Sequence, residues 1–359
     1  MKNIPVASIQ GLDSSVSGSV GWKSPSNLAI VKYWGKYGTQ FPRNASLSLT
    51  LSNAVTETHI DYHYKDKSGI SIEFLFEGQP KPNFESRIRR FLASITEYFP
   101  FLNHLHLKIS SGNSFPHSSG IASSASSMSA LALCLCDIEK QLAEKEMNAD
   151  TVIQKASFIS RLGSGSACRS VFPIAAIWGD HPGIEGASRE YAIPYGDKIN
   201  SAFKDFHDDI LIVSGQEKSV SSTAGHALME DNIFSDARYR QAQLRMSDLV
   251  NVMKEGDVDA FGKIAEDEAL TLHALMMCSN PSYMLMDPGS VAIIKKVRAF
   301  RSETRLPVYF SLDAGPNIHL LYPHEIHQDV EEFIDDELRN HCVNGTVLKD
   351  KVGKGPEKL

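Results

Sequence analysis

The chain has 359 residues, of which 42% are apolar and 22% charged, and this balance excludes a disordered polymer. With 36 basic and 43 acidic side chains the formal net charge is -7, which argues against a nucleic-acid partner because phosphate recognition needs a positive surface. The longest apolar runs are less than half of the roughly 20 residues that a membrane helix requires, so we expect no membrane contact. The length allows about two domains.

The cysteines and the N-terminus favour an enzyme of the reducing cytoplasm. The five cysteines form no CxxC pair and no Cys/His cluster with zinc spacing, and Cys134 and Cys136 lie in an apolar run typical of buried thiols. The first 20 residues contain one lysine and no apolar core of a secretory signal. The residues that would bind a metal stay unknown at this point.

Alternating apolar and polar residues predict strands in the first part of the chain. Residues 47–51, 60–64, 72–76 and 105–109 follow a period of two, which favours an antiparallel, half-buried sheet. Helical spacing follows, with one helix over 120–136 and another over 151–162.

The second part of the chain reads as a mixture of strands and longer helices. Buried strands are predicted at 171–178 and 209–214, and the Pro/Gly-punctuated stretch between them places a domain boundary near residue 196, giving domains 1–196 and 197–359. Two long helices, around 242–253 and 261–276, precede strands at 307–312 and 318–322, a helix near 326–340 and a solvated tail over 349–359. The expected fold class is α+β.

A serine-rich segment over residues 110–127 has the features of an anion site. It runs from a strand into a helix, and its small residues with Gly120 let backbone N–H groups approach a ligand closely at the positive end of the helix. The hydroxyls of Ser118, Ser119, Ser123 and Ser124 could bond phosphate oxygens or the waters of a bound Mg²⁺. A Ser-rich N-cap before a buried helix is an equally good interpretation. The chain contains no GxxxxGK[ST], GxGxxG or GxSxG motif, so ATP would not bind through a Walker loop.

Two further segments place charged side chains among small or aromatic neighbours. Arg169, within GSGSACRS, has no bulky neighbours, so its guanidinium can reach a carboxylate or phosphate in a bidentate manner, or simply pair with a surface acid. Lys32 and Lys36 lie four apart, on one side of either a strand or a helix, where a shared anion would relieve their repulsion. A solvated pair of lysines is the alternative.

The segment SLDAGPN, residues 311–317, lies between two apolar strands. Asp313 at the strand end is pinned by the following Gly-Pro and could serve as a base, although many such residues only start an Asx-turn. None of the thirteen histidines shows a pattern that predicts function.

Together and in this order, the segments resemble the diphosphomevalonate decarboxylase family, within the superfamily of galactokinase, homoserine kinase, mevalonate kinase and phosphomevalonate kinase (GHMP). The segments that carry the resemblance are SPSNLAIVKYWGK, NSFPHSSGIASSAS, GSGSACRS, SST and DAGPN. The resemblance implies a two-domain GHMP-kinase-like α+β fold with the active site in the cleft between an ATP-binding first domain, ribosomal S5 domain 2-like, and a second domain carrying DAGPN. It also implies ATP and Mg²⁺ as cofactors, and a homodimer.

The reaction that the resemblance implies belongs to the mevalonate pathway of isoprenoid biosynthesis. ATP phosphorylates the 3-hydroxyl of (R)-5-diphosphomevalonate, and phosphate and CO₂ then leave to give isopentenyl diphosphate. A 5-phosphomevalonate decarboxylase or a mevalonate 3-kinase on the same fold is an alternative, and a non-catalytic nucleotide-binding paralogue is an alternative of another class.

The resemblance also implies roles for individual residues. Asp313 would orient and deprotonate the 3-hydroxyl, Arg169 would hold the C1 carboxylate, and Lys32 would lie near the transferring phosphoryl group. Ser124 would position the triphosphate of ATP. Substrate contacts are implied for Asn27, Tyr33, Trp34, Gly35, Lys36, Arg87, Ser164, Gly165, Ser166, Ala167, Cys168 and Thr223. Contacts with ATP are implied for Ser111, Asn113, Pro116, Ser118, Ser119, Gly120, Ile121, Ala122 and Ser123.

Overall fold

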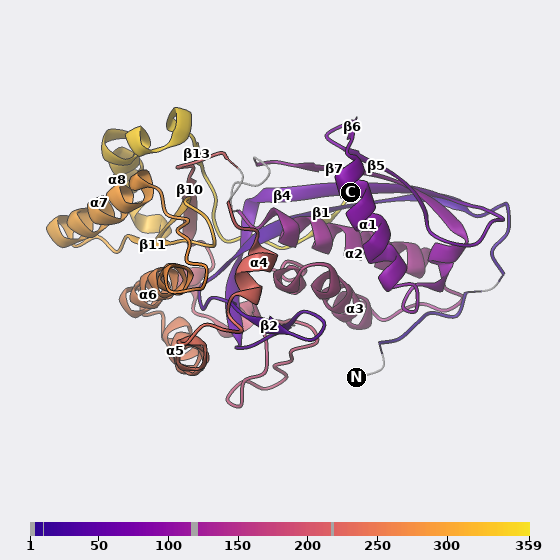
Figure 1. The fold of residues 1–359 in the computed structure, drawn as a ribbon, viewed down its shortest axis with the longest axis horizontal. Helices are drawn as coiled ribbons and strands as arrows, with labels where there is room; N and C mark the ends of the chain where they lie inside the picture. The colour runs from indigo at the N-terminus through magenta and orange to yellow at the C-terminus, as the bar shows by residue number, and fades with distance from the viewer. Residues whose placement is uncertain (1–3, 10, 116–120, 217–218) are drawn as a thin grey trace.

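The computed structural model describes residues 4–9, 11–115, 121–216 and 219–359. The fold is organised around two large sheets with helices packed on them (Figure 1). The mixture of strands and helices confirms the predicted α+β class. The ATP contacts predicted at Pro116, Ser118, Ser119 and Gly120 lie outside the described residues.

The larger sheet has eight strands in the order β14-β1-β4-β7-β5-β6, with β8 paired to β4 and β9 paired to β8. Its longest member, β4, is one strand of 19 residues that joins the two strands predicted at 47–51 and 60–64. The bounds of these strands are β1 Ser17–Ala29, β4 Ser46–Tyr64, β5 Ser71–Phe76, β6 Gln79–Pro80, β7 Leu105–Asn113, β8 Ala175–Trp178, β9 Ile193–Pro194 and β14 Glu357–Lys358.

One pair in this sheet departs from the predicted antiparallel arrangement. β5 and β7 run parallel, because the chain between them crosses over through helix α1, Pro82–Ser94. The sequence analysis did not predict this helix, although Pro82 in its first turn and the spacing of Ile88, Phe91 and Leu92 are typical signals of one.

Helices α2, Ser123–Leu142, and α3, Ala149–Gly163, confirm the two helices predicted in this part of the chain. α2 packs on β1 and β4, α3 packs on α2, and α1 packs on β5 (Figure 1). The apolar side chains of β4, β7 and α2 meet in a buried core that contains Ile60, Leu107, Leu131 and Leu135. This core holds the start of α2 in a fixed place beside the sheet.

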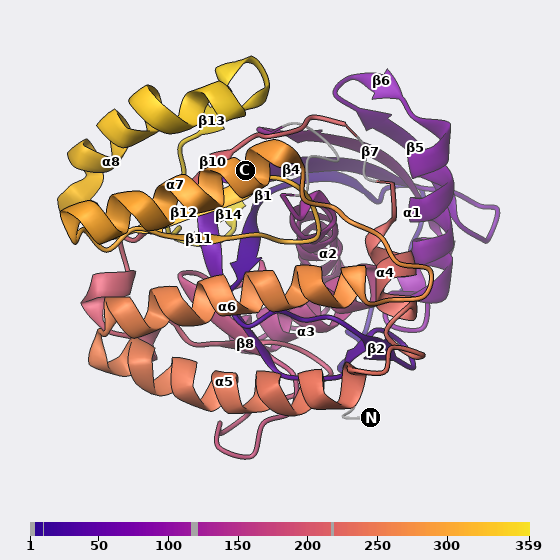
Figure 2. The ribbon, with the colours of Figure 1, turned by 60° about the vertical axis from the view of Figure 1, so that its left-hand side comes forward.

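The second part of the chain is built on a four-stranded sheet in the order β11-β12-β10-β13. Long helices lie beside it, and α5 and α6 run next to each other (Figure 2). Helix α7, which the sequence analysis missed, begins with a capping box of Asp287 and Ser290. The remaining elements are β2 Lys36–Tyr37, β3 Phe41–Pro42, β10 His207–Leu211, β11 Tyr309–Ser311, β12 Ile318–Tyr322, β13 Val347–Leu348, α4 Ser222–Ala227, α5 Ser235–Glu255, α6 Val258–Met277, α7 Pro288–Thr304 and α8 His327–Phe333.

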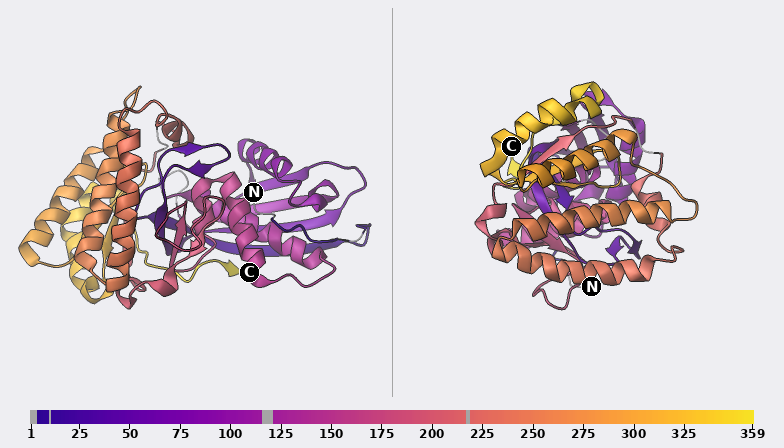
Figure 3. Two further views of the ribbon diagram at one scale, coloured as in Figure 1. Left: turned by 90° about the horizontal axis from the view of Figure 1, so that it is seen from below. Right: turned by 90° about the vertical axis from the view of Figure 1, so that its left-hand side faces the viewer.

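The C-terminal residues 349–359 are packed, so the prediction of a solvated tail is wrong. β14 pairs with β1, and the chain therefore returns from the second sheet to the first (Figure 3). The Asp350 carboxylate accepts hydrogen bonds from the backbone N–H groups of Ser52, Asn53 and Ala54 at 2.7–2.8 Å. Backbone pairing, one buried carboxylate and the buried side chain of Val352 hold this segment, and a single apolar residue makes no pattern that sequence reading detects.

The division into domains at residue 196 stays a prediction. β9 belongs to the larger sheet and β10 to the smaller one, whereas β14 rejoins the larger sheet. Within the described parts of the chain, every helix falls short of the length and apolarity that a bilayer crossing needs.

Candidate active site

A cavity of about 570 Å³ is lined by residues from both halves of the chain. Its walls come from the segment between β1 and β2, from α1, β7 and α2, from the turn after α3, from α4, and from the loop that carries Asp313. The sequence-predicted residues that line it are Lys32, Tyr33, Trp34, Lys36, Arg87, Ser111, Asn113, Ala122, Ser123, Ser124, Ser164, Gly165, Ser166, Arg169, Thr223 and Asp313.

Lys32 and Asp313 form an ion pair across the cavity. The Lys32 Nζ lies 2.8 Å from Asp313 Oδ1, and the lysine side chain is 2% exposed whereas that of the aspartate is 24% exposed. His273 Nε2 donates to the Asp313 backbone carbonyl at 3.1 Å, which fixes the loop from the other side. A carboxylate is thus held beside an ammonium and still opens onto the cavity.

The segment that carries Lys32 is neither strand nor helix. β1 ends at Ala29 and the next strand starts at Lys36, with Gly35 between them at a φ of 97°. The predicted placement of Lys32 and Lys36 on one side of a regular element is therefore wrong. Lys32 reaches Asp313, and Lys36 donates to Gln40 Oε1 at 3.0 Å, yet both line the cavity. Burial lowers the pKa of Lys36.

Arg169 ends a short 3₁₀ turn, Gly165–Arg169. Of the strand predicted after it at 171–178, only residues 175–178 form a strand. The Arg169 guanidinium is buried and partly committed: Nε donates to Asn27 Oδ1 at 3.2 Å and Nη1 to Ser46 Oγ at 2.8 Å. Burial lowers the pKa of Arg169, although the negative charge of Asp313 opposes this effect. Arg169 also lines the cavity, and a guanidinium has five N–H donors, of which these two contacts use two, so it suits an anionic ligand group.

One wall of the cavity is aromatic and contains a histidine that sequence reasoning missed. The ring of His226, on α4, lies 4.4 Å from that of Tyr33 and 4.5 Å from that of Trp34, between centroids. Its Nδ1 accepts the Gly35 backbone N–H at 2.9 Å. His226 follows the SST segment by only three residues, so the signal for it was its proximity to a predicted motif.

The start of α2 presents the anion-binding features that the serine-rich segment predicts. Its N-cap, Ala122, adopts a left-handed conformation with a φ of 45° and caps no backbone group with its side chain. Ser124 Oγ lies 3.2 Å from Ser164 Oγ, and both line the cavity. The first N–H groups of a 20-residue helix therefore point to a site rich in hydroxyls, which suits phosphate.

Several implied residues lie behind the cavity wall. Asn27 and Cys168 are buried beside Arg169, Ala167 and Ile121 are buried as well, and Gly35 supports His226 through its backbone. By contrast, Arg87 on α1 lines the cavity and forms no hydrogen bond or ion pair with the described residues. Arg87 is thus an exposed cation in the cavity lining.

The donor set fits magnesium that is bound mainly through phosphate and water. The described residues hold no group of three or more His, Cys, Asp or Glu side chains able to bind a metal. The serine hydroxyls and Asn113 around the start of α2 are hard oxygen donors, the type that Mg²⁺ accepts when it keeps several waters and bridges phosphate oxygens.

Two protein-family models match this chain, one in each half. The Diphosphomevalonate decarboxylase-like N-terminal domain matches residues 24–188, and the Mevalonate 5-diphosphate decarboxylase C-terminal domain matches residues 209–358. The diphosphomevalonate decarboxylase of Ganoderma lucidum is 29% identical over 338 residues, covering 87% of this chain and 80% of that protein. The phosphomevalonate decarboxylase of Haloferax volcanii is 27% identical over 310 residues, covering 86% of this chain and 89% of that protein.

A solved structure agrees with the same assignment. The structure of MDDEF in complex with MVAPP, AMPPCP and magnesium is 26% identical in sequence and has a TM-score of 0.81, covering 96% of this chain and 99% of that chain. The two domain matches lie on either side of residues 189–208 and together span most of the chain. With the cavity and its Lys32–Asp313 pair, they establish that this chain belongs to the diphosphomevalonate decarboxylase family, on the GHMP-kinase-like two-domain fold.

Proposed function

We propose that this protein catalyses the ATP-dependent decarboxylation of (R)-5-diphosphomevalonate to isopentenyl diphosphate, releasing ADP, phosphate and CO₂. The observation that carries the proposal is the meeting of Asp313, Lys32 and Arg169 in one cavity, although they lie in three separate segments of the sequence. A base, a buried ammonium and a guanidinium are the groups that this reaction needs.

ATP bound with Mg²⁺ supplies the phosphoryl group that turns the tertiary 3-hydroxyl into a leaving group. Asp313 accepts the proton of that hydroxyl as the oxygen bonds to phosphorus, and Lys32 Nζ, 2.8 Å from the same carboxylate, neutralises negative charge nearby. The hydroxyls of Ser123 and Ser124 and the start of α2 hold the phosphates of ATP in place.

Arg169 orients the second stage of the reaction. With Nε and Nη1 anchored by Asn27 and Ser46, its remaining donors grip the C1 carboxylate in one orientation. The electron pair of the C1–C2 bond then forms the new double bond as the C3–O bond breaks, so that CO₂ and phosphate leave together. A buried, fixed guanidinium suits this role because the carboxylate has to stay aligned until it departs.

Lys36, Arg87 and the Tyr33 hydroxyl would receive the 5-diphosphate. Lys36 and Arg87 both line the cavity, and Arg87 is exposed there. Because one relative is named a diphosphomevalonate decarboxylase and another a phosphomevalonate decarboxylase, the number of phosphates accepted is the point to test.

The direct test incubates the protein with ATP, Mg²⁺ and either 5-diphosphomevalonate or 5-phosphomevalonate, and measures ADP and CO₂ separately. We expect both products, with higher kcat/KM for the diphosphate. Higher kcat/KM for the monophosphate would assign the phosphomevalonate reaction instead. ADP without CO₂ would indicate a 3-kinase, and neither product would indicate a nucleotide-binding paralogue.

We also propose a cytoplasmic location and a homodimer. All five cysteines are free and four of them are buried, which suits a reducing compartment. Light scattering coupled to size-exclusion chromatography tests the dimer by its mass.

A further inference from the structure

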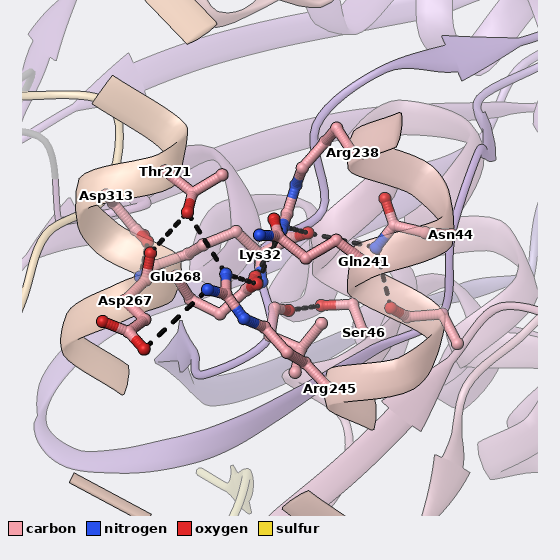
Figure 4. Close-up of polar contacts among 12 residues, drawn as sticks. Lys32, Asn44, Ser46, Arg238, Gln241, Arg245, Asp267, Glu268, Thr271 and Asp313 are labelled. Atoms are coloured by element: carbon pink, nitrogen blue, oxygen red, sulfur yellow. Dashed lines mark hydrogen bonds and ion pairs between the residues drawn. The ribbon is translucent and has the colours of Figure 1, made fainter. Parts of the chain in front are cut away.

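Lys32 is held by its backbone as well as by its side chain. Its N–H donates to Glu268 Oε2 at 2.7 Å, and its carbonyl accepts from Arg238 Nη2 at 3.1 Å and from Asn44 Nδ2 at 3.1 Å. Glu268 lies on α6 and Arg238 on α5, so two helices of the second half bind the backbone of one residue of the first half, at the peptide groups on either side of it (Figure 4).

The two gripping side chains also bind each other. Arg238 Nη1 lies 2.6 Å from Glu268 Oε1, and Nη2 lies 2.5 Å from Oε2, a bidentate pair in which both side chains are almost fully buried. Arg245 Nη1 adds a contact to Glu268 Oε1 at 2.8 Å. In Figure 4 the side chains of α5 and α6 point toward one another beside Lys32. We call Glu268 and Arg238 the backbone clamp.

The clamp is not explained by a contribution to folding stability. A buried ion pair is weak support for stability, because the cost of desolvating two charges can match or exceed their attraction. Burial alone would raise the pKa of Glu268, but the hydrogen bonds and charge of Arg238 outweigh it and hold that pKa below its usual range. An irregular segment, however, has no regular backbone hydrogen bonding to fix it, and Lys32 lies in such a segment.

We infer that Glu268 and Arg238 are positioning residues that fix the backbone of Lys32 and thereby aim its ammonium at Asp313 and the transferring phosphoryl group. This inference rests on the proposed function for its kinetic part only. Neither residue lines the cavity, so both act through Lys32. A displacement of about 1 Å at a reacting group can lower a rate by about 10²-fold, which sets the scale of the expected effect.

The chain offers a matched control on the same helix. Glu266, two residues before Glu268 on α6, is 5% exposed and is paired with Arg301 at 2.6 Å and Arg298 at 3.5 Å. It does not line the cavity and does not contact Lys32. Glu266→Gln therefore removes a buried, arginine-paired carboxylate without touching the clamp.

The kinetic experiment compares Glu268→Gln with Glu266→Gln. A glutamine has one carbonyl oxygen for the donors of Lys32, Arg238 and Arg245, and its NH₂ group would face a guanidinium. We expect Glu268→Gln to lower kcat by about 10- to 100-fold with KM values for ATP and substrate nearly unchanged. Glu266→Gln should keep kcat within about twofold of wild type. Melting temperatures of both variants separate loss of fold from loss of alignment.

A second readout needs no catalysis. Acetic anhydride labels accessible amines, and mass spectrometry reports acetylation at each lysine. We expect Glu268→Gln to accelerate labelling of Lys32 relative to wild type. Lys155 is the internal reference, because it is fully buried and paired with Glu139 at 2.6 Å elsewhere in the molecule. A general loss of structure would expose both lysines, whereas release of the clamp exposes Lys32 alone.

If Glu268→Gln does not fold, Arg238→Lys is the variant that tests the clamp. A lysine keeps the charge but lacks the fork that reaches both Glu268 and the Lys32 carbonyl, so the same changes in kcat and labelling are expected. Wild-type kcat together with wild-type labelling of Lys32 in the folded variants would overturn the clamp. If wild type itself releases no CO₂ from 5-diphosphomevalonate, the proposed function fails, and the labelling experiment still tests the clamp.

Discussion

The Asp313 carboxylate is bound by Lys32 and its carbonyl by His273 and the Gly315 N–H, and the carboxylate contact is the one that concerns its chemistry. Asp313→Asn keeps an oxygen for the ammonium and removes the group that accepts a proton. We expect kcat to fall by about 10²–10⁴-fold with binding little changed. Measuring ADP and CO₂ in the same reactions checks this, and near-normal CO₂ release would show that another group is the base.

Arg169 depends on its planar shape as much as on its charge. Two of its nitrogens are anchored by Asn27 and Ser46, and a lysine cannot make those contacts while also reaching a ligand. Loss of one charge-assisted hydrogen bond costs about 1.5–3 kcal/mol, so Arg169→Lys should lower kcat/KM by roughly 10–150-fold. Equal kcat/KM in wild type and variant would place the carboxylate of the substrate elsewhere.

Lys36 is the residue on which the preference for a diphosphate is expected to depend most directly. Lys36→Ala should raise KM for 5-diphosphomevalonate more than KM for 5-phosphomevalonate, by a difference on the scale of one charged contact, about 1.5–3 kcal/mol. The measurement is KM for both substrates at fixed salt. Lys108→Ala is the control, because Lys108 is an exposed lysine of β7 outside the cavity lining. An equal rise in KM for both substrates would show that Lys36 does not contact the terminal phosphate.

At the level of elements, the irregular segment between β1 and β2 contains one glycine, Gly35, in a backbone conformation that other residues rarely adopt. A Cβ at Gly35 would lie 2.2 Å from the Tyr239 hydroxyl, in addition to the strain of a φ of 97°. Gly69 has a φ of 112° but nothing within 4 Å of its Cβ position, so Gly69→Ala isolates the backbone strain. That strain costs about 1–2 kcal/mol at either position.

Gly35→Ala should therefore lower both the stability and kcat/KM, whereas Gly69→Ala should lower the stability alone. The activity loss follows because the new methyl group displaces Tyr239 or the segment that holds Lys32 and Lys36. Urea unfolding and steady-state kinetics on both variants supply the comparison. Unchanged kcat/KM in Gly35→Ala would mean that Tyr239 yields and the segment stays in place.

For the molecule as a whole, one buried histidine makes the folded state sensitive to acid. Burial lowers the pKa of His273 to about 4, against a partly opposing hydrogen bond to the Asp313 carbonyl. The unfolded chain takes up this proton near pH 6.5 and the folded chain does not, so the contribution is full above pH 6.5 and is lost as the pH falls toward 4.

His273→Gln keeps an N–H donor for the Asp313 carbonyl and removes the titration. Between pH 7.5 and pH 5.0, wild type should lose about 2 kcal/mol more of its free energy of unfolding than the variant does. Urea titrations at the two pH values measure this difference. The contributions of titrating groups that both proteins share cancel in it. An equal loss in the two proteins would show that His273 is protonated in the folded state.

Much of the fold was predictable because its signals are local. The period of two in β4 and β7, and the apolar faces of α2, α3, α5 and α6, state which side of each element is buried. Helices α1 and α7 carried comparable signals, in Pro82 and in the capping box of Asp287, and were missed by the sequence analysis. The tail was mispredicted because β14 is held by backbone pairing, which any polar sequence can make.

The sequence by itself determined the types of side chain at the site and the family that contains them, since Lys32, Arg169 and Asp313 lie in motifs recognisable one by one. Only the tertiary structure decided how they are held. Glu268 and Arg238 lie more than 200 positions from Lys32 and belong to helices whose pattern predicts burial alone, so their hydrogen bonds to its backbone have no local signal. Long-range hydrogen bonds to an irregular backbone depend on where helices dock, and docking is set by packing between distant faces.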